Sequence, residues 1–412
     1  ALPPAGRTTG PARDGRLSMA PTATRPRLTP LLLQSLLVAV LAAAVFAINL
    51  ETAPDFDELY HILAARGWLA TGEPRIADGI YNRGQLFTML VAGLFRPFRE
   101  SVAVARLGGL IPMALSAGVL FFWLRRTADA WAAWIAVALF VLSPFTVETA
   151  QFARFYGPQV LCFLVGTLLL VAATEPGTGR PQQAALLAGA VALLALAAEL
   201  QPTTLIGLVG IGLWLAAARV LPWLGKLGPR PRLLTMAALL GAGLLAVAVI
   251  LLSGLGADLW RQFRWTPEWA RATANQVWYY HFWLNLYYPS LWPLFPVLAL
   301  FALASFPRAA GLALAIFLPA VVLHSFGGMK DQRYMAYAWP FFFALLGLGL
   351  APLVGRLAGA VWAAATGAAG MLLPAQWQRP AAIALVGGCA VFLVLANTAF
   401  IRTALTFTDV RV

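Results

Sequence analysis

The stretch LLLQSLLVAVLAAAVFAINLETAPDFDELYHILAARGW, residues 31–68, decides the fold. It opens with an apolar run long enough for a helix that crosses a bilayer, which needs about 20 apolar residues. The carboxylates of Asp55, Asp57 and Glu58 follow directly. Ionised groups beside a bilayer are costly and mark functional sites. The stretch therefore predicts a membrane helix with a catalytic or binding site just outside it.

The composition extends this prediction to the whole chain. Of 412 residues, 61% are hydrophobic and only 11% are charged, whereas a soluble domain carries about 25% charged residues. Apolar runs of spanning length recur to the end of the chain, without the alternating pattern of an outer-membrane barrel. We expect an all-α polytopic membrane protein with 11–12 transmembrane helices and with juxtamembrane helices in its first outer loop.

The net charge of +13 comes almost entirely from arginine. In a membrane protein such residues follow topology and suit anionic headgroups, so membrane lipid is an expected partner and nucleic acid is not. Residues 1–29 are rich in Pro, Thr and Arg, which predicts a disordered cytoplasmic N-terminus. The transmembrane domain is expected over 30–405, followed by a tail at 406–412.

The positive-inside rule then places four catalytic loops outside. These outer loops are expected at 51–100, 144–157, 256–290 and 324–337. The first holds two interfacial helices, at about 57–70 and 84–95, and a basic cytoplasmic loop is expected at 219–232. Residues 357–378 fit either an eleventh span or a cytoplasmic interfacial segment, with a last span at 381–400.

Three residue clusters in the outer loops could carry chemistry. Asp57 and His61 lie four residues apart and share a helix face beside Tyr60, while Asp55 suits a helix cap. In KDQRY, residues 330–334, Lys330 is one of only two lysines and suits a point contact to phosphate. The alternative for this second cluster is an interfacial pair that reaches water.

The third cluster is Glu148 with the turn ARFY, residues 153–156, where Arg154 and Tyr156 fit an anionic headgroup site or an aromatic-belt turn. The loop 256–290 is denser in Trp and Tyr than a belt requires. It suits either an interfacial helix or a wall for a lipid or sugar. Trp278, Tyr279 and His281 of this loop are expected to line a substrate cavity. His324, at the end of the span expected at 309–325, is expected to line it as well.

Together these motifs resemble the GT-C membrane glycosyltransferases, and in particular the protein O-mannosyltransferase and aminoarabinose (lipid A) transferase superfamily. The likeness covers roughly residues 31–355. The segments that carry it are DELYHILAARGWLATGEP (57–74), YNRGQLFTMLVAGLF (81–95), SPFTVETAQFARFYGPQ (143–159) and HSFGGMKDQRYMAYAWP (324–340). The turn at 152–159 departs from the family, because Phe152 and Gln159 stand where an acid is common.

The resemblance implies transfer of a sugar from a polyprenyl-phosphate donor to a hydroxyl acceptor on a glycan, lipid or protein. Asp57 would be the base and Glu58 would orient the acceptor or its neighbours. The leaving phosphate needs only cations, and the candidates are Lys330, Arg333 and Arg154, with Tyr334 beside them. One direct displacement predicts inversion at the anomeric carbon.

The resemblance also bears on cofactor and location. Relatives of this type generally use no metal, so none is expected, although Asp57 and His61 leave a divalent ion as a secondary expectation. The expected location is the inner membrane of a bacterium, with the site on the extracytoplasmic side. A transporter or flippase of polyprenyl-linked sugars is the alternative function, and it would place charges along a path through the membrane.

Overall fold

The computed structural model describes residues 28–372, apart from 78, 176, 253 and 272–275, together with 374 and 377. Almost all of this part is helical, with one two-residue strand pair, β1 (Arg75–Ile76) and β2 (Gly79–Ile80). The expected all-α membrane architecture is confirmed. The helices are α1 (Leu28–Phe46), α2 (Phe56–Thr71), α3 (Gln85–Phe95), α4 (Val102–Thr127), α5 (Ala130–Val141), α6 (Pro144–Ala150), α7 (Tyr156–Ala173), α8 (Arg180–Leu200), α9 (Thr204–Leu215), α10 (Leu221–Gly225), α11 (Pro229–Leu252), α12 (Leu255–Arg264), α14 (Tyr279–Tyr287), α15 (Leu291–Ser305), α16 (Pro307–Ser325) and α17 (Trp339–Leu372).

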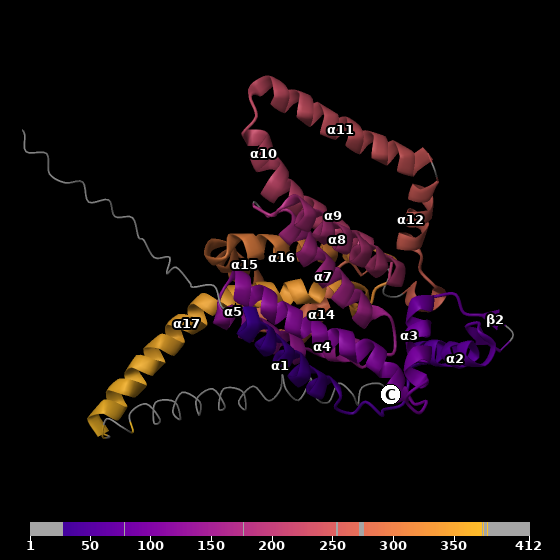
Figure 1. The fold of residues 1–412 in the computed structure, drawn as a ribbon, viewed down its shortest axis with the longest axis horizontal. Coiled ribbons are helices and arrows are strands. Elements are labelled where there is room, and N and C mark those ends of the chain that lie inside the picture. The colour runs from indigo at the N-terminus through magenta and orange to yellow at the C-terminus, as the bar shows by residue number, and fades with distance from the viewer. Residues whose placement is uncertain are drawn as a thin grey trace, which may run out of the picture.

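Seven helical segments of the described part are long and apolar enough to cross a membrane. Two bent pairs, α5 with α6 and α14 with α15, raise the number to as many as nine. The helices pack side by side, with α1 on α4, α17 on α5 and α15, and α7 on α8 (Figure 1). The predicted last span at 381–400 and the segments 1–27 and 406–412 lie outside the described residues.

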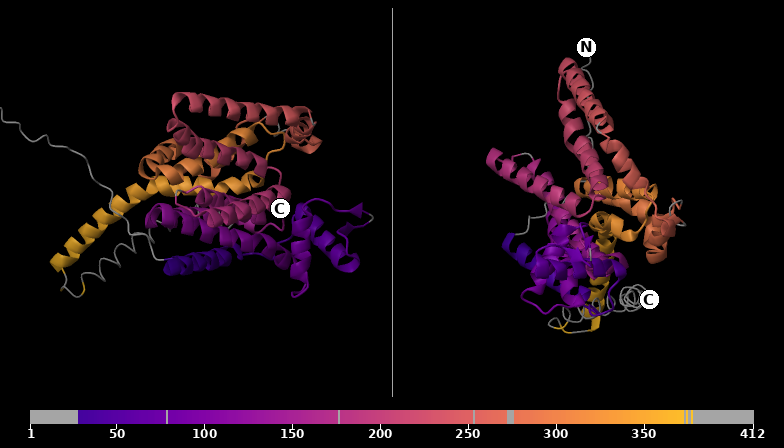
Figure 2. Two further views of the ribbon diagram at one scale, coloured as in Figure 1. Left: turned by 45° about the horizontal axis from the view of Figure 1, so that its top comes forward. Right: turned by 90° about the vertical axis from the view of Figure 1, so that its right-hand side faces the viewer.

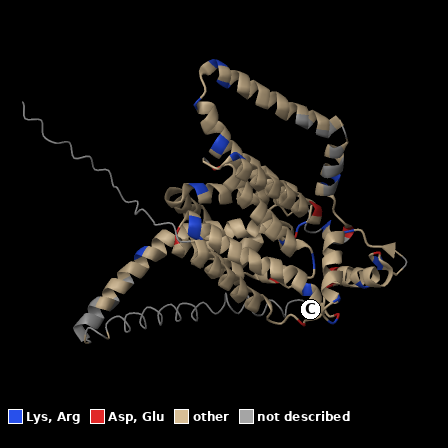
Figure 3. Cartoon of the chain, in the orientation of Figure 1, with Lys and Arg blue, Asp and Glu red and all other residues tan. Residues whose placement is uncertain are grey.

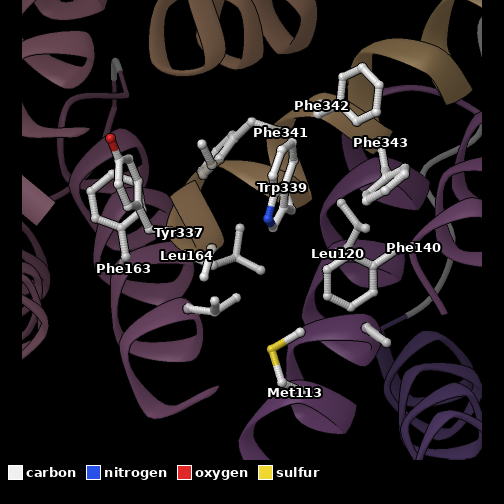
Figure 4. Close-up of a cluster of buried hydrophobic side chains, with 14 of the residues drawn as sticks. Met113, Leu120, Phe140, Phe163, Leu164, Tyr337, Trp339, Phe341, Phe342 and Phe343 are labelled. Carbon is white, nitrogen blue, oxygen red and sulfur yellow. The ribbon is translucent and has the colours of Figure 1, made fainter. Parts of the chain in front are cut away.

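Aromatic side chains fill the centre of the bundle. Phe341, Phe342 and Phe343 of α17 are fully buried, and Phe341 and Phe343 meet Phe163 of α7 and Phe140 of α5, respectively. Figure 4 shows this cluster, with residues from α4, α5, α7 and α17 converging on one apolar region. Such packing fixes how the helix ends that carry the polar side chains lie relative to one another.

The outer segment after α1 stands at one end of the bundle. Figures 1 and 2 show α2, α3 and the strand pair projecting together beyond the start of α4. The two interfacial helices predicted at 57–70 and 84–95 are present as α2 and α3. Gly84, which precedes α3, has φ +60°, and a Cβ there would come within 2.6 Å of the Phe155 ring. Only glycine fits both the backbone and this contact.

The structure corrects two local predictions. The expected basic loop at 219–232 is largely helical, because a π-helical turn and α10 extend α9 to Gly225 and α11 begins at Pro229. The segment 256–290, for which a helix was one of the two alternatives, contains α12 and α14. Residues 357–372 form no separate span or surface segment, because α17 continues through them to Leu372. Alanine favours this continuation, and neither Gly nor Pro stops the helix there.

Candidate active site

The first turn of α2 leaves Asp57 partly exposed at the surface. Asp55 is the N-cap, and its side chain accepts a hydrogen bond from the Asp57 backbone N–H at 2.8 Å. Glu58 completes a capping box by accepting from the Asp55 N–H at 2.8 Å. The predicted capping role of Asp55 is therefore what the structure shows. The side chain of Asp57 takes no part in the cap and stays 31% exposed.

Glu58 points the other way, into the protein. Its two carboxylate oxygens accept from Arg106 at 2.9 and 2.7 Å, and one also accepts from the Ala153 N–H at 2.7 Å. Both side chains of this pair are 0% exposed. Neither oxygen of Glu58 reaches the surface, so the contacts of this carboxylate are with protein groups.

Arg106 of α4 was missed by the sequence reasoning. Besides Glu58, it donates to the carbonyls of Leu50, Thr52 and Ala53 at 2.8–3.2 Å. It therefore ties the chain between α1 and α2 to α4, and through Glu58 to the turn before α7. Its position in the sequence, one turn inside an apolar span, could have revealed it. Burying an arginine there costs free energy unless its charge is paired.

Asp57 lies between two arginines from distant parts of the chain. One of its oxygens is 2.5 Å from Nη1 of Arg154 and 3.1 Å from Nη1 of Arg333. Arg333 is in turn 2.8 Å from Asp331 through its Nε. The structure thus brings together the three predicted clusters. Figure 3 shows acidic residues gathered mainly at this end of the bundle, with mostly uncharged helices beyond it.

Aromatic rings hold these two guanidinium groups in place. Arg154 lies over the Phe155 ring at 5.1 Å, and Arg333 over the Phe152 ring at 5.1 Å. Phe152 stands where the family often has an acid, and here its ring supports a cation. Tyr156 and Tyr334 pack nearby, with ring centroids 6.5 Å apart, and both are largely buried.

Two further cations differ in their accessibility. Lys330 is only 8% exposed and donates to the Gly327 carbonyl at 2.7 Å. Burial, with Arg264 adding to it, lowers the pKa of its ammonium. Arg83, before α3, is exposed and acts electrostatically on His61, Tyr81 and Tyr334. Sequence reasoning missed Arg83, whose sole signal was its place in the turn that precedes an interfacial helix.

His61 is enclosed by aromatic rings. Its Nδ1 is 2.9 Å from the Thr88 hydroxyl, and the rings of Tyr81, Phe87 and Phe155 meet it edge to face at 5.1–5.7 Å. Burial, helped by Arg154 and Arg83, lowers the pKa of His61 to about 3. His61 is therefore neutral at pH 7. Tyr60 stacks on Tyr81 at 5.3 Å beside it.

The other predicted cavity residues divide into two sets. Glu148 and Tyr279 lie within electrostatic reach of each other, and Tyr279 also within reach of Asp331. His281 accepts from the Trp292 indole at 2.9 Å, and the buried His324 is 3.2 Å from the Tyr337 hydroxyl. Trp278 is 66% exposed on α14. No contact with Asp57 is recorded for these last three residues.

The described side chains do not assemble three His, Cys, Asp or Glu residues into a group that could hold a metal ion. Asp57 and His61 share a helix, yet His61 is directed into its aromatic surround and Asp57 towards the arginines. The secondary expectation of a divalent ion at this pair remains a prediction.

Comparisons with known proteins identify the fold. No protein-family model and no curated protein matches the chain. ArnT from Cupriavidus metallidurans in the apo state has a TM-score of 0.59 at 17% identity, over 92% of this chain and 74% of ArnT. ArnT bound to undecaprenyl phosphate gives 0.59 at 16% identity, over 93% and 75%.

The archaeal oligosaccharyltransferase AglB from Archaeoglobus fulgidus, in complex with an inhibitory peptide and a dolichol-phosphate, also has a TM-score of 0.59. Its identity is 14%, over 92% of this chain and 56% of AglB. ArnT and AglB are GT-C glycosyltransferases, so this chain has the GT-C fold. The resemblance predicted from the motifs is confirmed at the level of the fold.

Proposed function

We propose that this protein is a glycosyltransferase that moves a sugar from a polyprenyl-phosphate donor to a hydroxyl acceptor. The observation that carries the proposal is the meeting of Asp57, Arg154 and Arg333 from three distant segments, with the Asp57 side chain still 31% exposed. The GT-C fold supports the same reaction class. The undecaprenyl phosphate on ArnT and the dolichol-phosphate on AglB support the class of donor.

Asp57 is the base in this proposal. Its carboxylate accepts the proton of the acceptor hydroxyl as that oxygen attacks the anomeric carbon of the donor sugar. The new carbon–oxygen bond forms as the bond to the phosphate oxygen breaks, and the electron pair leaves with the phosphate. One displacement of this kind inverts the anomeric configuration.

The leaving phosphate needs positive charge and no proton donor. Arg83, Arg154 and Arg333 supply three positive charges near the site, against two carboxylates, Asp57 and Asp331. One positive charge is left over for an anion. A guanidinium has five N–H donors, so Arg333, which is 21% exposed, can bind a phosphate oxygen while it still holds Asp57. Arg154 is only 3% exposed, so it acts on the phosphate through its charge unless the donor displaces the groups that cover it. Lys330 reaches the phosphate only after it exchanges its bond to the Gly327 carbonyl.

Glu58 and Arg106 act as positioning residues in this scheme. The pair ties the loop that carries Asp57 to α4 and to the Ala153 N–H, one residue before Arg154. The base and one phosphate-binding cation are therefore held by the same buried ion pair. This fixed geometry stabilises charge in the transition state without reorganisation.

The site is proposed to face the extracytoplasmic side of a bacterial inner membrane. Arg125 and Arg126 end α4, about 30 Å from Arg106 along the helix at 1.5 Å per residue. That length matches the hydrocarbon core of a bilayer. The positive-inside rule favours a cytoplasmic position for the Arg125–Arg126 end, which supports an extracytoplasmic position for Asp57.

Transfer by the purified protein in lipid nanodiscs tests the proposal. Radiolabelled polyprenyl-phosphate mannose, arabinose and aminoarabinose would be supplied with glycan, lipid and peptide acceptors. We expect one donor to lose its label to a hydroxyl product, and Asp57→Asn to abolish that transfer. Glu100→Gln, a change to an acid of the same outer segment that pairs with Arg66, is the control. Movement of labelled donor between leaflets without any product would show a flippase and overturn the proposal.

A further inference from the structure

Helix α14 carries an aromatic strip, Tyr279, Trp283 and Tyr287, that the proposed reaction does not use. The three residues are spaced four apart, which places them along one face of the helix. The Trp283 and Tyr287 rings stack at 5.5 Å and 17°, and Tyr279 lies 6.2 Å from Trp283. All three side chains are half-buried, so part of each ring remains open to a ligand.

The strip lies between the most exposed and the most buried face of α14. Trp278, Phe282 and Leu286 are 53–66% exposed, whereas the face that includes Tyr280 and Leu284 is buried. Helix α14 is bent by 95° from α15, so it lies along the membrane surface when α15 crosses the bilayer. The aromatic strip therefore lies at the border between the exposed and the buried face of α14, where its rings pack against the core on one side and keep part of their surface open on the other.

The strip also starts at the catalytic cluster. The Tyr280 hydroxyl, next to Tyr279, donates to the Asp331 carbonyl at 3.0 Å. Asp331 in turn binds Arg333, which contacts Asp57. From Tyr279 to Tyr287 the helix rises about 12 Å, which is longer than one sugar ring. The aromatic strip therefore leads away from the cluster that contains Asp57, over a distance longer than one sugar ring.

Carboxylates accompany this aromatic surface. Glu148 acts electrostatically on both Tyr279 and Tyr287, and Asp331 acts on Tyr279. Phe145, on the same short helix as Glu148, meets the Tyr287 ring edge to face at 5.1 Å. Helix α6 and its half-buried acid therefore run beside the strip.

We infer that the aromatic strip binds the acceptor, and that the acceptor is a glycan of more than one sugar. This inference rests on the proposed function and names its acceptor class. A sugar offers C–H faces to ring surfaces and hydroxyl donors to carboxylates, and Tyr and Trp combine an apolar body with a polar tip. A polyprenyl tail has no hydroxyl groups for the tyrosine hydroxyls and carboxylates beside the strip, whereas a glycan offers them along its whole length.

Saturation-transfer NMR and titration with the purified full-length protein in nanodiscs test the inference without requiring turnover. The probes are mannotriose and arabinotriose, each compared with its methyl monoglycoside. We expect one trisaccharide to bind more tightly than its monoglycoside. Trp283→Leu should weaken that trisaccharide about tenfold, or about 1.4 kcal/mol, and leave the monoglycoside unchanged.

Two variants serve as controls. Trp283→Phe keeps an aromatic face and should restore most of the affinity, which separates ring stacking from misfolding. Phe282→Leu changes the neighbouring lipid-facing stripe and should leave trisaccharide binding as in the wild type. The inference is overturned if neither trisaccharide binds better than its monoglycoside, or if a Ser/Thr peptide binds in a Trp283-dependent manner in their place.

A donor comparison separates this inference from the proposed function. If Trp283→Leu raises the KM of a decaprenyl-phosphate sugar but not that of a farnesyl-phosphate sugar, the strip holds the lipid tail. That result overturns the glycan inference and leaves glycosyl transfer intact. Absence of transfer by the wild type would instead count against the proposed function. The binding titration would still show whether the aromatic strip binds a glycan.

Discussion

Replacing Arg106 should destabilise the protein more than any other single change at the outer face. Arg106→Met leaves the Glu58 carboxylate buried without its cation and removes the donors to the carbonyls of Leu50, Thr52 and Ala53. Breaking a buried pair by removing one partner costs about 3–5 kcal/mol. Glu58→Gln keeps the shape and one acceptor, so we expect a smaller loss of about 1.5–3 kcal/mol.

The free energy of unfolding would be measured by titration with denaturing detergent in mixed micelles, for both single variants and the double variant. Since the two side chains act as one unit, the double variant should lose less than the sum of the singles by about 0.5–3 kcal/mol. Arg66→Met removes an exposed ion pair on the same outer segment and should cost no more than about 1 kcal/mol. Equal losses for Arg66→Met and Arg106→Met, or strict additivity of the Arg106 and Glu58 changes, would refute the reasoning.

Three further outcomes follow from the site. Asp57→Asn should abolish transfer while the KD of the donor, measured by equilibrium binding, stays within a few-fold of wild type; near-normal turnover would remove Asp57 as the base. Arg83→Gln should raise the donor KM about tenfold or more, which corresponds to the loss of a hydrogen bond to a charged group. Lys330→Met should raise the donor KM less, because Arg83 is exposed and Lys330 is not. A larger increase for Lys330→Met would assign phosphate binding to Lys330. His61 has a pKa of about 3 in the folded protein, below its ordinary 6.5, so its share of stability is complete above pH 6.5 and is lost as the pH falls towards 3, by up to about 1.4 kcal/mol per pH unit. Melting curves between pH 4.5 and 7.5 should therefore show a shallower acid loss for His61→Phe, and identical slopes would contradict the burial argument.

The sequence predicted the outer helices and the meeting of the acidic and basic clusters. Helix α2 was predictable because a capping box precedes an apolar period, and α3 because its apolar length is too short to span. Asp57 and Arg333 could be paired since topology placed both at the same membrane face. These predictions depended on sequence patterns within one segment, such as a cap or an apolar length, or on the membrane side that topology assigns to a whole loop.

What the sequence did not predict depends on directions of side chains that only packing decides. Asp57 and Glu58 are neighbours, yet the helix turns one outward and the other onto Arg106. The place of Arg106 one turn inside a span indicated that its charge is paired, but nothing local indicated that Glu58 and the loop before α2 would supply the partners. The run of α17 to Leu372 was hidden because Ala-rich sequence is weakly apolar while it remains strongly helical.

The distances along the chain between the members of the ion-pair cluster have a consequence for biosynthesis. Asp57 emerges from the ribosome early, whereas Arg333 is translated near the end of the described residues. A nascent chain inserted only as far as α16 therefore presents a carboxylate with half of its guanidinium partners. In the proposed reaction, the base and the anion-binding groups are complete only when the last segments dock, so a partly synthesised protein would lack the site that consumes lipid-linked sugar.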